Sequence, residues 1–173
     1  MASSPTDPTI PTSIRASRSL IVTAVDYRHA LNSLIGAGRS TLRIFDADGA
    51  QLELNAGKRL ESFSAFLRAN TEAKLIIIVR SIEHIEKKCP RFVELVALHG
   101  NQVAVCQTDV EAPRVEDCFL IADTIHFARR TVQAHPRGVV VRDDEAETAP
   151  MIERFQQLQG AATIVSLTTT LGL

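Results

Sequence analysis

The sequence of 173 residues has no tryptophan, one tyrosine and only 5% aromatic residues. Proteins that bind single-stranded nucleic acid by stacking need exposed aromatic rings, so this composition argues against that mode of recognition. The net charge at pH 7 is −1, so the chain has no overall positive field that would attract nucleic acid or an anionic membrane. Any site for a phosphate group therefore has to come from a local basic patch.

Cysteine is also scarce, and long apolar runs are missing. Cys89, Cys106 and Cys118 form an odd set without a C-x-x-C pair, which favours buried thiols in a reducing compartment over a disulfide framework. No apolar run reaches the ~18 residues of a transmembrane helix. The N-terminus has neither the basic start nor the apolar segment of a secretory signal. These absences predict a cytoplasmic protein that does not insert into a membrane.

The composition changes near residue 20. Residues 1–19 are rich in Ser, Thr and Pro and are expected to form a disordered tail. Residues 20–173 are long enough to bury a substantial core, and the whole chain is 45% apolar. We therefore expect a single domain over residues 20–173.

Helical and strand patterns alternate early and change later. The spacing of apolar residues predicts helices over 26–35 with Asp26 as N-cap, 58–70, 81–98 with a break at Pro90, and 145–159. Strands are predicted at 40–45, 73–79, 102–107, 118–122 and 138–142, and the last residues could add an edge strand. The strands 118–122 and 138–142 are expected to pair directly, with a basic loop between them. This order predicts an α/β fold, a mixed β-sheet flanked by helices.

The stretch from Arg114 to Arg130, R-V-E-D-C-F-L-I-A-D-T-I-H-F-A-R-R, is the most informative part of the chain. Its apolar strand ends in Asp123 and a basic segment follows. In position and order it resembles the H-x-K-x-x-x-x-D motif of the phospholipase D superfamily. Counting back from Asp123 puts Glu116 at the histidine and Cys118 at the lysine. The resemblance covers about residues 44–158 and implies one half of a phospholipase D-like domain.

The chain also resembles a family of uncharacterised bacterial phospholipase D-like domains that lack the catalytic pair and occur alone or attached to acetyltransferases. The matching pieces are C-P-R-F at 89–92, the strand from Asp117 to Asp123, and the terminal L-G-L. In the active superfamily a histidine attacks phosphorus and the lysine stabilises charge on the equatorial oxygens. A carboxylate and a neutral thiol cannot replace them. We therefore expect no phosphodiesterase activity, no catalytic residue and no cofactor.

Active relatives bring two such motifs together, from two halves or two subunits, so the resemblance also implies a possible homodimer. The principal hypothesis is a non-catalytic binding or assembly module. An alternative is a protein that binds a phosphate-containing ligand or nucleic acid through a local basic edge. The candidate ligand-binding residues are Arg91, Asp117, Asp123, His126, Arg129 and Arg130.

Two of these residues have competing interpretations. Arg91 could point at a phosphate or pair with a structural partner such as Asp117. Asp123 is either a relic of an active site or a turn residue bonded to backbone amides. A further alternative is an enzyme of another type that uses Asp123 with Cys118 or His126. No metal site is expected, since His84 has Lys88 and not a second ligand at the i+4 position.

Overall fold

The computed structural model describes residues 15–108, 116–132 and 134–167. Its helices are α1 (Ala24–Ala37), α2 (Gly57–Ala69), α3 (Glu83–Lys88), α4 (Pro90–Leu98) and α5 (Glu145–Gly160), with a 3-10 turn η1 at Ala50–Leu52. Its strands are β1 (Ser17–Ile21), β2 (Thr41–Asp46), β3 (Lys74–Val79), β4 (Val103–Thr108), β5 (Cys118–Ala122), β6 (His126–Arg130), β7 (Gly138–Arg142) and β8 (Ala162–Ile164).

These strands form one mixed sheet in the order β1-β7-β6-β5-β2-β3-β4-β8. The central strands β2, β3 and β4 are parallel, because a helical crossover joins each to the next. β5, β6 and β7 form an antiparallel meander beside β2. β1 closes one edge against β7, and β8 closes the other against β4. The expected α/β fold with a mixed sheet and flanking helices is confirmed.

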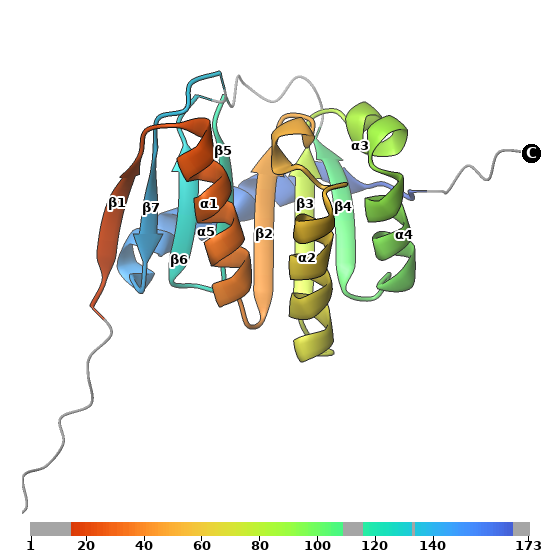
Figure 1. Cartoon of the computed structure of the whole chain (residues 1–173), viewed down its shortest axis with the longest axis horizontal. Helices are drawn as coiled ribbons and strands as arrows, with labels where there is room; N and C mark the ends of the chain where they lie inside the picture. The colour runs from red at the N-terminus through yellow and green to blue at the C-terminus, as the bar shows by residue number, and fades with distance from the viewer. Residues whose placement is uncertain (1–14, 109–115, 133, 168–173) are drawn as a thin grey trace, which may run out of the picture.

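The sheet lies between two helical layers (Figure 1). Helices α1 to α4 cover one face, and α5 crosses the other face on its own among the described helices. Successive side chains of the central strands point to opposite layers. Leu120 belongs to the core under α1 and α2, whereas its neighbour Phe119 packs against Phe155 of α5. We call the two sides of the sheet the α1 face and the α5 face.

The prediction for the segment after Asp123 was wrong. His126 to Arg130 is not a basic loop but the strand β6, which pairs with β5 on one side and β7 on the other. Strands 118–122 and 138–142 are therefore not direct neighbours. Four of the five residues of β6 are buried, which is unexpected for a segment with one histidine and two arginines.

Two smaller boundaries also differ from the sequence analysis. Ser17 to Ser19, assigned to a disordered tail by composition, begin strand β1. Helix α1 is capped by Thr23, whose hydroxyl accepts from the Asp26 amide; Asp26 in turn accepts from the Thr23 amide as part of a capping box. The expected edge strand near the C-terminus is present as β8. In the described part of the chain, no helix has the length and apolar character needed to cross a membrane.

Candidate functional site at the carboxyl edge of the sheet

Polar side chains gather where the parallel strands end. Asp46 closes β2 and Arg80 follows β3, so both lie at the carboxyl edge of the sheet. β5 is antiparallel to β2, and β6 is antiparallel to β5, so Cys118 at the start of β5 and Arg130 at the end of β6 reach this same edge. Open α/β sheets commonly bind ligands outside the carboxyl ends of their strands.

Two hollows open at this edge. One has a volume of about 430 Å³, and its walls include Gln51, Arg80 and Glu116. The other has a volume of about 550 Å³ and is lined by Tyr27, Gln51 and Arg130 together with the first residues of α1. Gln51 and Ala134 line both, so the two hollows are neighbours.

Arg130 forms the wall between the second hollow and the core. The residue is only 3% exposed, and its guanidinium carbon lies 5.1 Å from the centre of the Tyr27 ring, in a cation–π arrangement. Its Nε donates to the carbonyl of His135 at 2.9 Å, and its Nη1 donates to Oε1 of Gln51. The guanidinium is thus held in place by an aromatic face and by neutral acceptors.

A group of buried polar side chains lies beneath Arg130. Burial raises the pKa of Tyr27 well above its usual value and raises the pKa of the Cys118 thiol to about 11. Burial also raises the pKa of Asp46, although the Gly49 and Asp48 amides donate to its Oδ1 and oppose that shift. Among the described residues, Oδ2 of Asp46 is buried without a hydrogen-bond partner, and the Tyr27 hydroxyl lies beside the Cys118 thiol.

Glu116 and Cys118 differ in their access to this edge. Glu116 is exposed and faces the smaller hollow. Cys118 is fully buried on the α1 face, within reach of the electrostatic influence of Asp46 and Arg130. With its pKa near 11, the thiol is neutral at physiological pH. The positions that the phospholipase D resemblance assigns to a nucleophile and a cation thus hold an exposed carboxylate and a buried neutral thiol.

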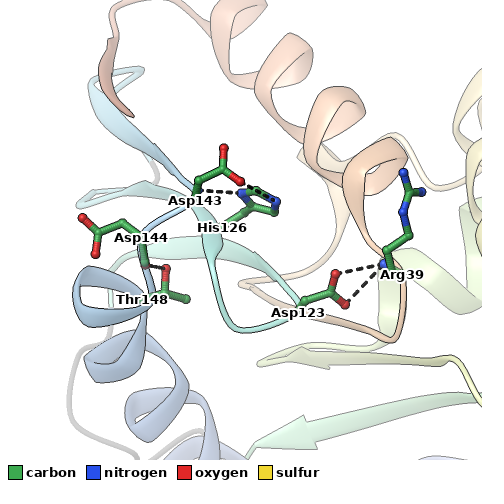
Figure 2. A network of polar contacts seen from close by, with 6 residues as sticks. All are labelled: Arg39, Asp123, His126, Asp143, Asp144 and Thr148. Atoms are coloured by element: carbon green, nitrogen blue, oxygen red, sulfur yellow. Dashed lines mark hydrogen bonds and ion pairs between the residues drawn. The ribbon is translucent and has the colours of Figure 1, made fainter. Parts of the chain in front are cut away.

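Asp123 lies at the opposite edge of the sheet, after the last residue of β5 (Figure 2). Its carboxylate accepts from the amides of Arg39, Ser40 and Thr41 at 2.8–3.0 Å. Burial alone would raise the pKa of this carboxyl, but the bonds from Thr41, Ser40 and Arg39 outweigh burial and lower it. With φ of 55°, Asp123 is in the left-handed region that aspartate tolerates in turns. It is therefore a turn residue bonded to backbone amides.

His126 supports a second turn at this opposite edge. Its Nδ1 accepts from the amide of Asp143 at 3.0 Å, and its Nε2 lies 4.0 Å from the Asp143 carboxylate (Figure 2). Asp144 then caps α5, with its side chain accepting from the Glu147 amide. Both ring nitrogens of His126 thus face Asp143, and the histidine fixes the connection from β7 to α5.

Asp117 and Arg129 lie together on the α5 face. Asp117 is 2% exposed, and its two carboxylate oxygens accept from Arg129 Nε at 3.0 Å and from Arg154 Nη2 at 2.8 Å. Arg91 stands apart at the start of α4, where its amide donates to Asn55. Asp117 pairs with Arg129 and Arg154, and not with Arg91.

The six candidates from the sequence thus do not form one cleft. Arg130 belongs to the carboxyl edge, Asp123 and His126 to the opposite edge, Asp117 and Arg129 to the α5 face, and Arg91 to α4. Cys118 and Asp123 lie beyond reach of each other at the two ends of β5, which removes the pairing that an enzyme using both would need. The described residues include no group of three or more His, Cys, Asp or Glu side chains that could hold a metal ion.

Sequence reasoning missed four residues of the carboxyl edge: Tyr27, Asp46, Gln51 and Arg80. Two of them had a usable signal. Asp46 and Arg80 are the first polar residues after the apolar parts of two predicted parallel strands, where the carboxyl-edge rule expects ligand contacts. Tyr27 and Gln51 reach the site from a helix and a short turn, and no local pattern marks them.

Solved structures with the same fold come from the phospholipase D family and from a chromatin protein. Nuc from Salmonella typhimurium, a phospholipase D family member, has a TM-score of 0.65 and 12% identity and is matched over 87% of this chain and 99% of Nuc. NucT from Helicobacter pylori has a TM-score of 0.60 and 15% identity, over 87% of this chain and 100% of NucT. At these identities the likeness establishes the fold alone.

TrmBL2, an archaeal chromatin protein with a novel mode of DNA binding, has a TM-score of 0.63 and 13% identity. The match covers 91% of this chain and 57% of TrmBL2. A sequence search against curated proteins gave no significant match. The sequence profile of one family, described as the domain of unknown function DUF7931, matches residues 23–165. Since that range is most of the chain, the protein belongs to this family.

Proposed function

We propose that the chain is a phospholipase D-like binding or assembly module that does not hydrolyse phosphodiesters. The observation that carries this proposal is the state of Cys118, a buried thiol with a pKa of about 11 at the place of the lysine. A neutral thiol supplies no charge to the equatorial oxygens of a phosphoryl group. The carboxylate of Glu116, at the place of the nucleophilic histidine, would repel an anionic substrate.

A phosphodiesterase assay on the full chain tests the proposal. Bis(p-nitrophenyl) phosphate and plasmid DNA serve as substrates, with an active enzyme of the phospholipase D family as positive control. We expect no turnover above background from the wild type, Glu116→Gln or Asp123→Asn. Turnover by the wild type that disappears in Asp123→Asn or Glu116→Gln, with the fold intact by circular dichroism, would overturn the proposal.

Binding of a phosphorylated ligand or nucleic acid is the second candidate function. Arg80 favours it, because this half-buried guanidinium lines the smaller hollow and has no ion-pair partner among the described residues. The likeness to a DNA-binding chromatin protein gives further support. Here Arg80 would hold the anion in the smaller hollow and Arg130 would line the neighbouring one. Arg91, His126 and Arg129 would not contribute to the same site.

This second function is tested with labelled duplex DNA and with inorganic phosphate. We expect DNA affinity to fall steeply between about 50 mM and about 500 mM salt, and Arg80→Gln to weaken both ligands about tenfold. Arg68→Gln, an exposed arginine on α2, is the matched control and should have no effect. Absence of any binding at low salt would exclude this function.

A homodimer in the cytoplasm is the assembly that fits the proposal. A half-domain lacks the second half against which its relatives pack, and the free, buried state of Cys89, Cys106 and Cys118 fits a reducing compartment. Light scattering on the purified chain should give the mass of a dimer at high concentration. A monomer at all concentrations would contradict the dimer and leave the enzymatic test above unaffected.

A further inference from the structure

A groove of about 730 Å³ lies over β1, β7 and the connection between β6 and β7, at the end of the sheet far from α4. In the register of these strands Leu20 is opposite Val139 and Arg18 is opposite Val141. Val139 and Val141 belong to the α5 side of the core, so the groove lies on the α5 face. Helix α5 packs mainly over β4, β5, β6 and β8 and reaches β1 through the ion pair of Glu147 with Arg18.

The groove has two arginines on its walls and an apolar floor. Arg18 and Arg137 line it together with the ring of His135, and no carboxylate does so among the described residues. Glu147 pairs with Arg18 from α5, whereas Arg137 is exposed and has no ion-pair partner in the described part of the chain. Leu20 and Val139 form the apolar part, and Leu20 is 77% exposed.

This combination selects among possible occupants. Nucleic acid would gain from Arg137 but not from Leu20, since a phosphodiester backbone offers no apolar group and the groove has no aromatic ring for a base. A second copy of the chain related by a two-fold axis would bring the same cations face to face, which is repulsive. An acidic segment that also carries an apolar side chain complements both the walls and the floor.

We propose that the β1–β7 groove binds an acidic peptide segment of a partner protein. One Leu, Ile or Val of the segment packs on Leu20 and Val139, and a carboxylate beside it meets Arg137, next to the Arg18–Glu147 ion pair. The groove shares Val132 and Pro136 with the two hollows of the carboxyl edge, but the groove residues that this proposal uses line neither hollow. The proposal therefore does not depend on whether the chain hydrolyses phosphodiesters or binds DNA at that edge.

The test uses three short labelled peptides of equal length: one alternating Glu and Leu, one alternating Glu and Ser, and one alternating Lys and Leu. Anisotropy with the full chain at about 50 mM salt should show binding of the Glu-Leu peptide, weaker binding of the Glu-Ser peptide and none of the Lys-Leu peptide. Arg137→Glu and Leu20→Ser should each weaken the Glu-Leu peptide about tenfold or more.

Matched controls come from the opposite face of the sheet. Leu98 on α4 is 79% exposed, close to the value of Leu20, so Leu98→Ser and Arg68→Glu should leave binding unchanged. Equal loss in these controls, or no binding of the Glu-Leu peptide at low salt, overturns the proposal. A duplex DNA that binds through Arg137 while the Glu-Leu peptide does not would also overturn it, in favour of a nucleic-acid surface.

Discussion

Two aspartates show how the environment of a carboxyl group decides its role. Asp46 and Asp123 both follow apolar strand residues and both accept from backbone amides. Asp46 is fully buried with one oxygen unpaired, and its pKa is raised by burial. Asp123 is only half-buried, and its bonds to three successive amides overcome burial and lower its pKa. The two residues should therefore respond to pH in opposite directions.

Asp123→Asn should destabilise the fold by roughly 1–3 kcal/mol at pH 7. The carboxylate now accepts hydrogen bonds from backbone amides with both oxygens, and asparagine would place an NH2 group, which is itself a donor, at one of these positions. Because the pKa of Asp123 is lower in the folded protein than in the unfolded chain, its ionised carboxylate stabilises the fold at pH values above the unfolded-state pKa. This stabilisation is lost as the pH falls through the folded-state pKa. Urea unfolding at pH 7 and at about pH 3 measures the free energy of unfolding of both proteins. The difference between the variant and the wild type should be smaller at the acid pH. Glu61→Gln, an exposed change on α2, should show no deficit.

Asp46→Asn should behave in the opposite way. Its remaining oxygen can still accept from Gly49 and Asp48, while the cost of a buried charge is removed. Because the folded pKa is raised, wild-type stability should fall relative to the variant as pH rises from about 4 to 7. Chemical denaturation across that pH range measures the difference. A variant that is less stable at every pH would mean that the ionised carboxyl has a compensating partner.

Among the elements, β6 departs most from its sequence pattern. Its alternation sends Phe127 and Arg129 to the α5 face and His126 and Arg130 to the α1 face. Each polar side chain has a partner from another element, which allows a basic segment to lie in the middle of a sheet.

The ion pairs of Asp117 link β6 to the rest of the α5 face. Asp117→Asn leaves Arg129 and Arg154 without their shared carboxylate and should cost roughly 1.5–3 kcal/mol. Thermal or urea unfolding measures this loss. In a double-mutant cycle, Asp117→Asn combined with Arg154→Gln should cost less than the sum of the single changes. Strict additivity would show that the ion pair between Asp117 and Arg154 contributes nothing to stability.

Local patterns were sufficient for most elements and insufficient for the site. Apolar periodicity identified β3 and α2 nearly to the residue, because their side chains pack where the sequence period points. It failed for β6, since an arginine gives the same local signal whether solvated or paired inside a sheet. The same limit applies to Tyr27 and Gln51, whose position at the carboxyl edge follows from tertiary packing.

At the scale of the whole molecule, the sheet has a well-packed centre and two thin edges. β3 pairs on both sides and is covered by helices, whereas β1 pairs only with β7 and most of its residues are exposed. At the other edge, β8 has three residues and Ile164 is exposed. Stability is therefore expected to be uneven across the fold.

Hydrogen exchange measured by mass spectrometry should follow this gradient. Amides of β3 are expected to exchange last, and those of β1 and β8 first, because edge strands open without unfolding the core. Exchange measured on dilute protein serves as the reference for exchange at high concentration. If the amides of β1 exchange slowly at high concentration and faster on dilution, a second copy of the chain covers this edge.

The pairing of β1 with β7 also sets an order of events during synthesis. In this pairing Ser17 is opposite Arg142 and Ile21 is opposite Gly138. β1 is therefore synthesised before the other strands of the sheet but is among the last to pair. The crossovers through β2, β3 and β4 can form while the ribosome is still translating, since their contacts are closer in sequence. β1 must wait for the β5–β6–β7 meander to emerge. A nascent chain stalled before residue 138 would therefore carry its first strand unpaired, ready for a chaperone that recognises extended segments.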